Sequence, residues 1–141
     1  MPDLKNLTER FYKEVFDNRN IDALDEFIAA DVVEHEEPPP GLVLEPGREG
    51  VKQMLSTYLG GFDPLGVTIH EQYQDGNTVI ARVTFHGTHV GDFAGLPATG
   101  KSFSAQTIDI MRFEDGLVAE HWGQFDAVAM LTQLGAIPPM E

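Results

Sequence analysis

The chain of 141 residues contains no cysteine, and this absence removes several classes of site at once. It excludes disulfides, thiolate metal sites and cysteine nucleophiles, so a disulfide-stapled secreted domain is untenable. Long apolar runs are also missing, and none approaches the ~20 residues that a membrane-spanning helix needs. The first residues, MPDLK, lack the basic start and apolar centre of a signal peptide. We therefore expect a cytoplasmic protein without a membrane partner.

Basic residues are scarce as well: nine Lys and Arg stand against 23 Asp and Glu, for a formal net charge of −14. This charge repels phosphate backbones and anionic lipid surfaces, so we expect no nucleic-acid partner. Acidity of this kind is typical of a soluble surface and does not by itself define an acidic binding site. With 42% apolar residues, the chain suits one globular domain over residues 1–141.

The periodicity of the apolar residues changes halfway along the chain. Helical spacing predicts helices over 3–18, 21–29 and 47–59, and a short last helix over 126–134. A short extended segment is predicted over 31–35 and a proline-rich loop over 36–46, and alternation predicts strands over 67–73, 78–90, 102–113 and 117–125. Helices followed by adjacent antiparallel strands indicate an α+β fold, with a strongly curved sheet of about four long strands covered on its concave side by the N-terminal helices. A cavity between the two layers would be the natural place for a small molecule.

The hairpin over 102–125 carries the main candidate site. A three-residue loop over 114–116, with Gly116 in the left-handed conformation, would set Asp109 opposite His121 on one face of the sheet. In such a pair the carboxylate holds the tautomer of the ring and raises its basicity, as acid–base catalysis requires. A cross-strand pair that only satisfies a buried polar spot has the same pattern. A loop shorter or longer by one residue would set Asp109 opposite Trp122 instead.

Further polar residues stand where the chain would enter the sheet. Glu34 and His35 follow the second predicted helix, near the expected mouth of the cavity. They could form a second polar cluster, or they could belong to a solvated acidic loop with the two glutamates that follow. We assign Glu34, His35, Met111 and Trp122 to substrate binding, and Asp109 and His121 to catalysis. No HExxH or other ligand spacing is present, so we expect no metal.

Several segments together resemble the SnoaL-like polyketide (ester) cyclases, which belong to the wider nuclear-transport-factor-2-like, cystatin-like fold. They are GTHVGDFAGLPATGK at 87–101, IDIMR at 108–112, DG at 115–116, EHW at 120–122 and LTQLG at 131–135. With the leading helices, the resemblance covers nearly the whole chain. It implies a cone-shaped α+β barrel, no cofactor, a homo-oligomer (dimer or tetramer), and an intramolecular aldol reaction on a small hydrophobic molecule.

The resemblance also implies a catalytic pair that this sequence does not keep. In the cyclases a carboxylate just after the His-Trp pair acts as general acid/base, assisted by a histidine on the preceding strand. Here the carboxylate position falls on Gly123, and the histidine position is occupied by Asp109. A polar position after the second helix, often Asn in the family, falls on Glu34.

Two hypotheses therefore follow. The first is a cofactor-independent cyclase or isomerase that acts on a small hydrophobic carbonyl compound, with Asp109 as base and His121 orienting or relaying the proton. The second is a non-catalytic protein of the same fold that binds an apolar ligand. Epoxide hydrolysis is a third possibility on this fold, but the sequence has no clear Asp-Arg-Asp relay to support it.

Overall fold

A computed structural model describes residues 3–138 of the chain. The helices are α1 (Leu4–Tyr12), which continues as a π-helical turn (Lys13–Asp17), α2 (Leu24–Phe27), which follows a 3-10 turn (Ile21–Ala23), α3 (Arg48–Gly61) and α4 (Ala127–Gln133). The strands are β1 (Ile28–Glu34), β2 (Phe62–Asp75), β3 (Thr78–His89), β4 (Ser102–Glu114) and β5 (Leu117–Phe125).

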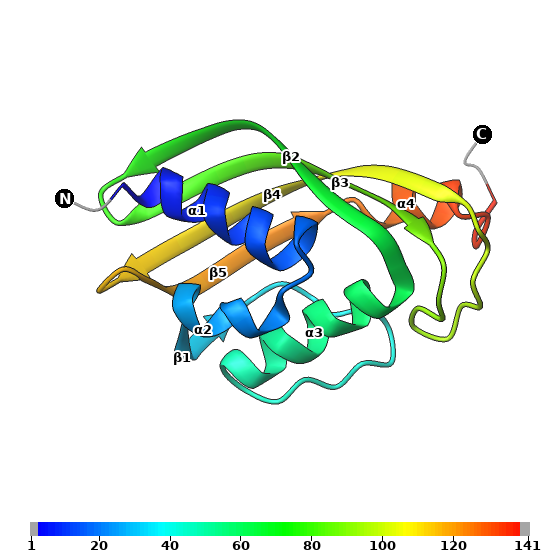
Figure 1. Ribbon diagram of the computed structural model, residues 1–141, viewed down its shortest axis with the longest axis horizontal. Helices are drawn as coiled ribbons and strands as arrows, with labels where there is room; N and C mark the ends of the chain where they lie inside the picture. Colours follow the sequence, from blue (N-terminus) through cyan, green and yellow to red (C-terminus); the bar gives the residue numbers. More distant parts are fainter. Residues whose placement is uncertain (1–2, 139–141) are drawn as a thin grey trace.

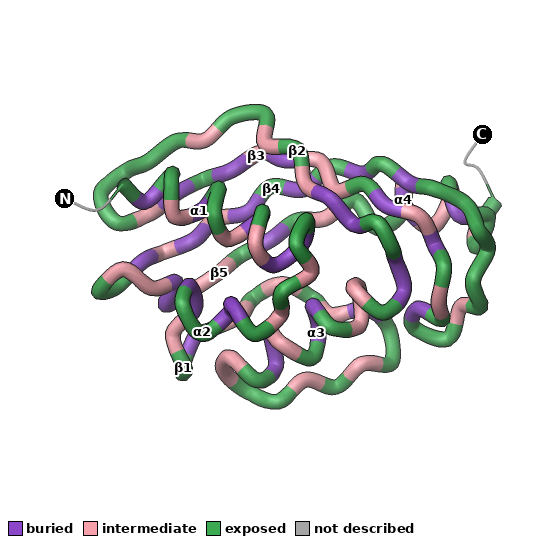
Figure 2. The backbone as a smooth tube through the Cα atoms, in the orientation of Figure 1, coloured by how far each residue is buried: buried purple, intermediate pink, exposed green. Residues whose placement is uncertain are grey.

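The strands form one curved sheet in the order β1-β5-β4-β3-β2, and α1, α2 and α3 lie across one face of it (Figure 1). Side chains alternate across the sheet, so every second residue of β4, from Phe103 to Phe113, is buried beneath the helices (Figure 2). α4 packs at the far end of β4, where Gln133 exchanges two hydrogen bonds with the backbone of Ser104. The predicted α+β architecture with helices on a curved sheet is confirmed.

The first strand differs from the prediction. The sequence pattern extends the second helix to residue 29 and begins a short extended segment at residue 31, but the helix ends at Phe27 and Ile28 already begins β1. β1 pairs in parallel with β5, so the sheet is mixed and has five strands rather than about four antiparallel ones. Glu34 is the last residue of this edge strand.

The register of the β4–β5 hairpin also differs from the prediction. The loop has two residues, Asp115 and Gly116, which both have positive φ as a type I′ turn requires. A bulge then leaves Ala119 without a partner, because Arg112 pairs with Glu120 while the next residue pairs with Val118. Each irregularity moves the register by one residue.

As a result, Asp109 lies opposite Gly123, and His121 lies opposite Met111. The predicted direct pairing of Asp109 with His121 is therefore wrong by two residues. Because side chains alternate with a period of two, a shift of two leaves Asp109 and His121 on the same face as diagonal neighbours. Among residues 3–138, no helix has both the length and the apolar composition needed to cross a membrane.

Candidate active site

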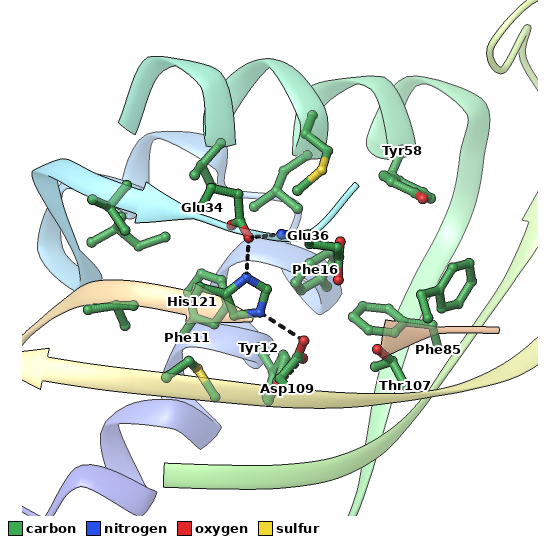
Figure 3. A pocket seen from close by; sticks show the side chains of 18 of the residues that line it. Phe11, Tyr12, Phe16, Glu34, Glu36, Tyr58, Phe85, Thr107, Asp109 and His121 are labelled. Atoms are coloured by element: carbon green, nitrogen blue, oxygen red, sulfur yellow. Dashed lines mark hydrogen bonds and ion pairs between the residues drawn. The ribbon is translucent and has the colours of Figure 1, made fainter. Parts of the chain in front are cut away.

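A pocket lies between the helical layer and the concave face of the sheet. Its walls are mostly apolar and come from all the layers: Phe11, Phe16, Ile28, Val32, Val51, Met54, Leu55, Leu65, Phe85, Phe103, Met111, Val118 and Phe125. The polar residues that line it are Tyr12, Glu34, Glu36, Tyr58, Thr107, Asp109 and His121 (Figure 3). An apolar pocket with a few convergent polar groups is typical of a small-molecule site.

Asp109 is the centre of the polar cluster. It is only 6% exposed, because its position on β4 points beneath α1. The Tyr12 hydroxyl of α1 donates to Asp109 Oδ2 at 2.5 Å, and His121 Nε2 donates to Oδ1 at 2.9 Å. Burial, together with the charge and hydrogen bond of Asp109, raises the pKa of Tyr12 well above 10.0, so the phenol stays a donor. Both oxygens of Asp109 thus have a fixed partner.

His121 joins two carboxylates. Its Nδ1 donates to Glu34 Oε1 at 2.6 Å, while Nε2 donates to Asp109 (Figure 3). Burial by itself lowers the pKa of His121, but the hydrogen bonds to Asp109 and Glu34 and their negative charges outweigh it. The net result is a pKa well above 6.5, so the ring is an imidazolium at neutral pH. The site therefore holds a buried cation between two anions.

Glu36 adds a third carboxylate from the loop after β1. Burial is the main reason why the pKa of Glu36 rises from 4.5 to about 7. The charge of Asp109 raises this pKa further, that of His121 lowers it, and that of Glu34 raises it. At neutral pH Glu36 is consequently divided between its protonated and ionised forms, which is the condition for proton transfer in either direction.

The structure brings together four of the six residues that the sequence singles out. Asp109, His121 and Glu34 form one hydrogen-bonded chain, and Met111 lines the pocket opposite His121. His35 and Trp122 lie outside the pocket lining, on the other face of the sheet. Their rings stack on each other at 4.8 Å, and His35 Nε2 bonds Glu120 Oε2 at 2.7 Å.

Four polar residues of the pocket were not predicted as site residues. Tyr12 and Tyr58 lie within predicted helices, Glu36 within the predicted acidic loop, and Thr107 within the predicted strand that carries Asp109. Thr107 is 2% exposed and its hydroxyl Oγ1 has no hydrogen-bond partner among residues 3–138. An unpaired buried hydroxyl costs about 1–3 kcal/mol, so it is a natural partner for a polar atom of a ligand.

The polar cluster around Asp109 contains the one group of three or more His, Asp or Glu side chains within residues 3–138 that could hold a metal ion. Ligand atoms of Glu36, Asp109 and His121 lie within 4.8 Å of one another. However, both ring nitrogens of His121 are engaged with carboxylates, and a cation would have to displace the proton that holds them together. We therefore assign no metal to this cluster. That the protein uses neither a metal nor a cofactor remains the prediction made from its sequence.

The raised pKa of Glu36 predicts a pH-dependent difference in stability. Because the folded state holds this proton more tightly than the unfolded chain, the stabilisation is present below pH 4.5 and is lost as the pH rises to about 7. Its full size is about 3 kcal/mol. The variant Glu36→Gln has no such proton to lose. The free energy of unfolding of the variant minus that of the native protein should therefore be larger at about pH 8 than at about pH 5. Urea titrations at both pH values measure this difference.

The exposed neighbour Glu37 supplies the control for that measurement. Glu37→Gln removes the same charge one residue further along the loop, and its difference from the native protein should stay constant with pH. A constant difference for Glu36→Gln too would show that Glu36 titrates as an ordinary glutamate.

The fold and the site together define a class of protein: an α+β fold of the nuclear-transport-factor-2-like kind, with a pocket between the helices and a curved sheet. The chain belongs to the SnoaL-like polyketide cyclase family, whose profile matches residues 6–134. The resemblance seen in the sequence is thereby confirmed. Similar solved structures agree with both the fold and the family.

TsrD from Streptomyces laurentii is 30% identical, with a TM-score of 0.83 over 95% of this chain and 96% of TsrD. IdmH, described as a putative polyketide cyclase from Streptomyces antibioticus, is 31% identical, with a TM-score of 0.80 over 95% of this chain and 99% of IdmH. Among curated relatives, the aklanonic acid methyl ester cyclase DnrD of Streptomyces peucetius is 37% identical over 65 residues. That match spans 46% of this chain and 45% of DnrD, so less than half of the relative is covered.

Proposed function

We propose that this protein carries out cofactor-independent acid–base chemistry on a small hydrophobic carbonyl compound, either an aldol-type cyclisation or an isomerisation. The observation that carries the proposal is the polar chain Tyr12–Asp109–His121–Glu34 in the wall of an otherwise apolar pocket. The apolar walls suit a carbon skeleton, and the polar wall suits its carbonyl groups. Membership of the cyclase family supports the same class of substrate.

In this proposal Asp109 is the base that removes a proton from the carbon beside the carbonyl group. Its neighbour His121 carries a positive charge, which stabilises the negative charge that develops on the enolate oxygen. Glu34 fixes the orientation of the ring through Nδ1, so the Nε2 proton stays directed at Asp109 and the reacting atoms. The protein would supply position and charge, and the chemistry needs no cofactor.

Two compounds test the proposal on the native protein. 2-Tetralone is a bicyclic aromatic ketone with acidic α-protons, and aklanonic acid methyl ester is the compound in the name of the relative DnrD. We expect both to raise the thermal unfolding midpoint, and we expect the protein to accelerate α-proton exchange of 2-tetralone in D2O, followed by NMR. Binding without exchange, and without conversion of the ester, would contradict the proposal.

That contrary result would support the second candidate, a non-catalytic binding protein of the same fold. One observation favours it: Tyr12, Asp109, His121 and Glu34 satisfy one another, as the members of a structural polar cluster do. Such a network would shape a pocket without taking part in a reaction. The two candidates share the ligand class and differ only in turnover.

We also propose that the protein is a homo-oligomer that associates through the outer face of the sheet. Tyr73, Ile80, Ile110 and Trp122 are successive cross-strand partners and form an apolar row on that face. Three of them are among the large exposed apolar side chains, which mark interaction surfaces when they are contiguous.

Sedimentation velocity of the native protein tests this interface, and it should give a mass greater than the 15.6 kDa of one chain. Ile110→Lys should yield the monomer, whereas Ser56→Lys on α3 should not; a native monomer would contradict this proposal.

A further inference from the structure

The backbone of β5 leaves a space in the wall of the pocket at Gly123. This glycine is buried, lies directly opposite Asp109 and belongs to the strand that carries His121. A Cβ atom built on Gly123 would lie 1.9 Å from Glu36 Oε1, 2.9 Å from Glu36 Cδ and 3.1 Å from Asp109 Oδ1. Any side chain at this position would therefore collide with the Glu36 carboxylate. The carboxylate of Glu36 occupies the volume that a side chain of residue 123 would fill.

The alternation of an extended segment delivers Glu36 to this volume. The backbone N–H of His35 donates to the carbonyl oxygen of His121 at 2.9 Å, which continues the pairing of β1 with β5 past the end of the strand. Glu34 and Glu36 consequently point to the pocket side while His35 points outward. The backbone N–H of Glu36 also donates to Glu34 Oε1 at 2.9 Å, and this hydrogen bond fixes the backbone of Glu36 relative to the Glu34 side chain.

Charged and titratable groups from five elements face Glu36. They are Tyr12 of α1, Glu34 at the end of β1, Tyr58 of α3, Asp109 of β4 and His121 of β5. β2 and β3 contribute the apolar Leu65 and Phe85. Ligand atoms of the Glu36 and Asp109 carboxyl groups lie within 4.8 Å of each other, and burial together with the charge of Asp109 raises the pKa of Glu36, which favours its protonated form. Asp109 instead accepts hydrogen bonds from Tyr12 and His121.

The hydrogen bonds divide the three carboxylates of the pocket into two kinds. Asp109 and Glu34 accept hydrogen bonds from other side chains, whereas the Glu36 carboxyl group has no hydrogen-bond donor among residues 3–138. Its hydrogen-bonding capacity is therefore available to a ligand. The unpaired hydroxyl of Thr107 lies in the same pocket.

We propose that Glu36 is the general acid of this site, placed there because residue 123 is a glycine. This deepens the function proposed above and rests on it. A C–H bond beside one carbonyl group breaks and its proton goes to Asp109. The released electron pair forms the new C–C bond to a second carbonyl carbon. The π electrons of that carbonyl move to its oxygen, which takes the proton of Glu36, and the proton on Asp109 then passes to Glu36. No atom is gained or lost overall, so the product is an isomer of the substrate.

The first test removes the proton and keeps the shape of the side chain. In 2-tetralone, which has one carbonyl group, Glu36 would protonate the carbonyl oxygen while Asp109 removes the α-proton, so the ketone passes through its enol. Glu36→Gln should therefore lower α-proton exchange of 2-tetralone by about 10²-fold or more, because an amide can donate a hydrogen bond but cannot transfer its proton to that oxygen. The native rate should fall as the pH rises through about 7, where Glu36 loses its proton, and this limb should vanish in the variant. Glu37→Gln should keep both the native rate and the native pH profile.

The second test moves the carboxyl group from the loop to the strand. Glu36→Ala should lose activity, and the double variant Glu36→Ala with Gly123→Asp should regain at least about tenfold over it, because the aspartate would place a carboxyl in the same volume. Gly123→Val in the native background should also lose activity, since it displaces Glu36. In Gly123→Val the displaced Glu36 should be exposed to solvent. NMR of 13C-labelled glutamate carboxyls should then show its pKa within the ordinary range of a glutamate.

The outcomes separate this proposal from the one on which it rests. If Glu36→Gln exchanges 2-tetralone like the native protein while Asp109→Asn does not, the general-acid role of Glu36 is overturned and the proposed function stands. No regain of activity in the double variant, with both variants folded by NMR, would also count against the role. If the native protein neither exchanges the α-protons of 2-tetralone nor converts aklanonic acid methyl ester, both proposals fall.

Discussion

Replacing Asp109 by asparagine is expected to lower turnover of a carbonyl ligand by about 10²–10⁴-fold while leaving its affinity nearly unchanged. The amide has the size and shape of the carboxylate but cannot accept a proton at neutral pH. Its carbonyl oxygen can still accept a hydrogen bond from Tyr12 or from His121, which bind the two oxygens of the native side chain. The pocket should therefore survive while the base is lost.

The measurement pairs two quantities on the same samples: the dissociation constant of 2-tetralone by titration and its α-proton exchange rate by NMR. Asp115→Asn is the matched control, because Asp115 is exposed in the turn of the same hairpin at a positive φ that asparagine tolerates. It should change neither quantity. Equal loss of binding and exchange in Asp109→Asn would indicate that Asp109 shapes the pocket rather than acting as a base.

Replacing His121 by phenylalanine should destabilise the fold by about 3–5 kcal/mol at neutral pH, because it removes the one cation of the cluster. Glu34 and Asp109 would lose a charged donor at 2.6 and 2.9 Å and would face each other and Glu36 without compensation. The apolar ring fills the space but offers no hydrogen bond. Equilibrium urea unfolding at about pH 7 measures the loss.

The loss should shrink as the pH falls, since the remaining carboxylates of the variant can then take up protons and end their repulsion. His70→Phe is the control: His70 is exposed on β2, and within residues 3–138 its side chain bonds only the Thr84 hydroxyl, so its replacement should cost no more than about 0.5 kcal/mol. A difference below about 1 kcal/mol for His121→Phe would contradict a buried cation between two carboxylates.

The hairpin shows how far sequence reasoning reaches into this site. The period-two alternation of β4 and β5 placed Asp109 and His121 on one face, and the structure has them hydrogen-bonded there. Their pairing was wrong because two one-residue irregularities, the shorter turn at Asp115–Gly116 and the bulge at Ala119, add to two. Bulges depend on how a strand fits its neighbours, and a single sequence carries little signal for them.

The other members of the cluster come from segments where the local pattern says nothing about the site. Tyr12 falls within the first predicted helix without any mark of a site residue, and only the packing of α1 over β4 brings its hydroxyl to Asp109. Glu36 stands in an acidic stretch before consecutive prolines, so solvation was an equally good interpretation. The glycine at 123 was noted as a missing carboxylate, but the side chain that fills its space is 87 residues away in the chain and is visible only in three dimensions.

His35 and Trp122 show the opposite error, in which residues beside the site were included in it. Each is next in sequence to a member of the cluster, Glu34 or His121, and alternation turns each to the outer face. There they stack on each other and extend the apolar row that we propose as a subunit interface. In a strand, a residue two positions from a site residue shares its face of the sheet, whereas the adjacent residue points to the opposite face.

A crystal structure of the protein with bound 2-tetralone tests the central claim most directly, because it locates the carbonyl oxygen relative to the carboxyl cluster. We expect the ring system among the phenylalanines of the pocket, the carbonyl oxygen within about 3.2 Å of the Glu36 carboxyl, and the α-carbon turned toward Asp109. A ligand bound outside this pocket, or one whose carbonyl points away from Glu36 and Asp109 into the apolar wall, would contradict it.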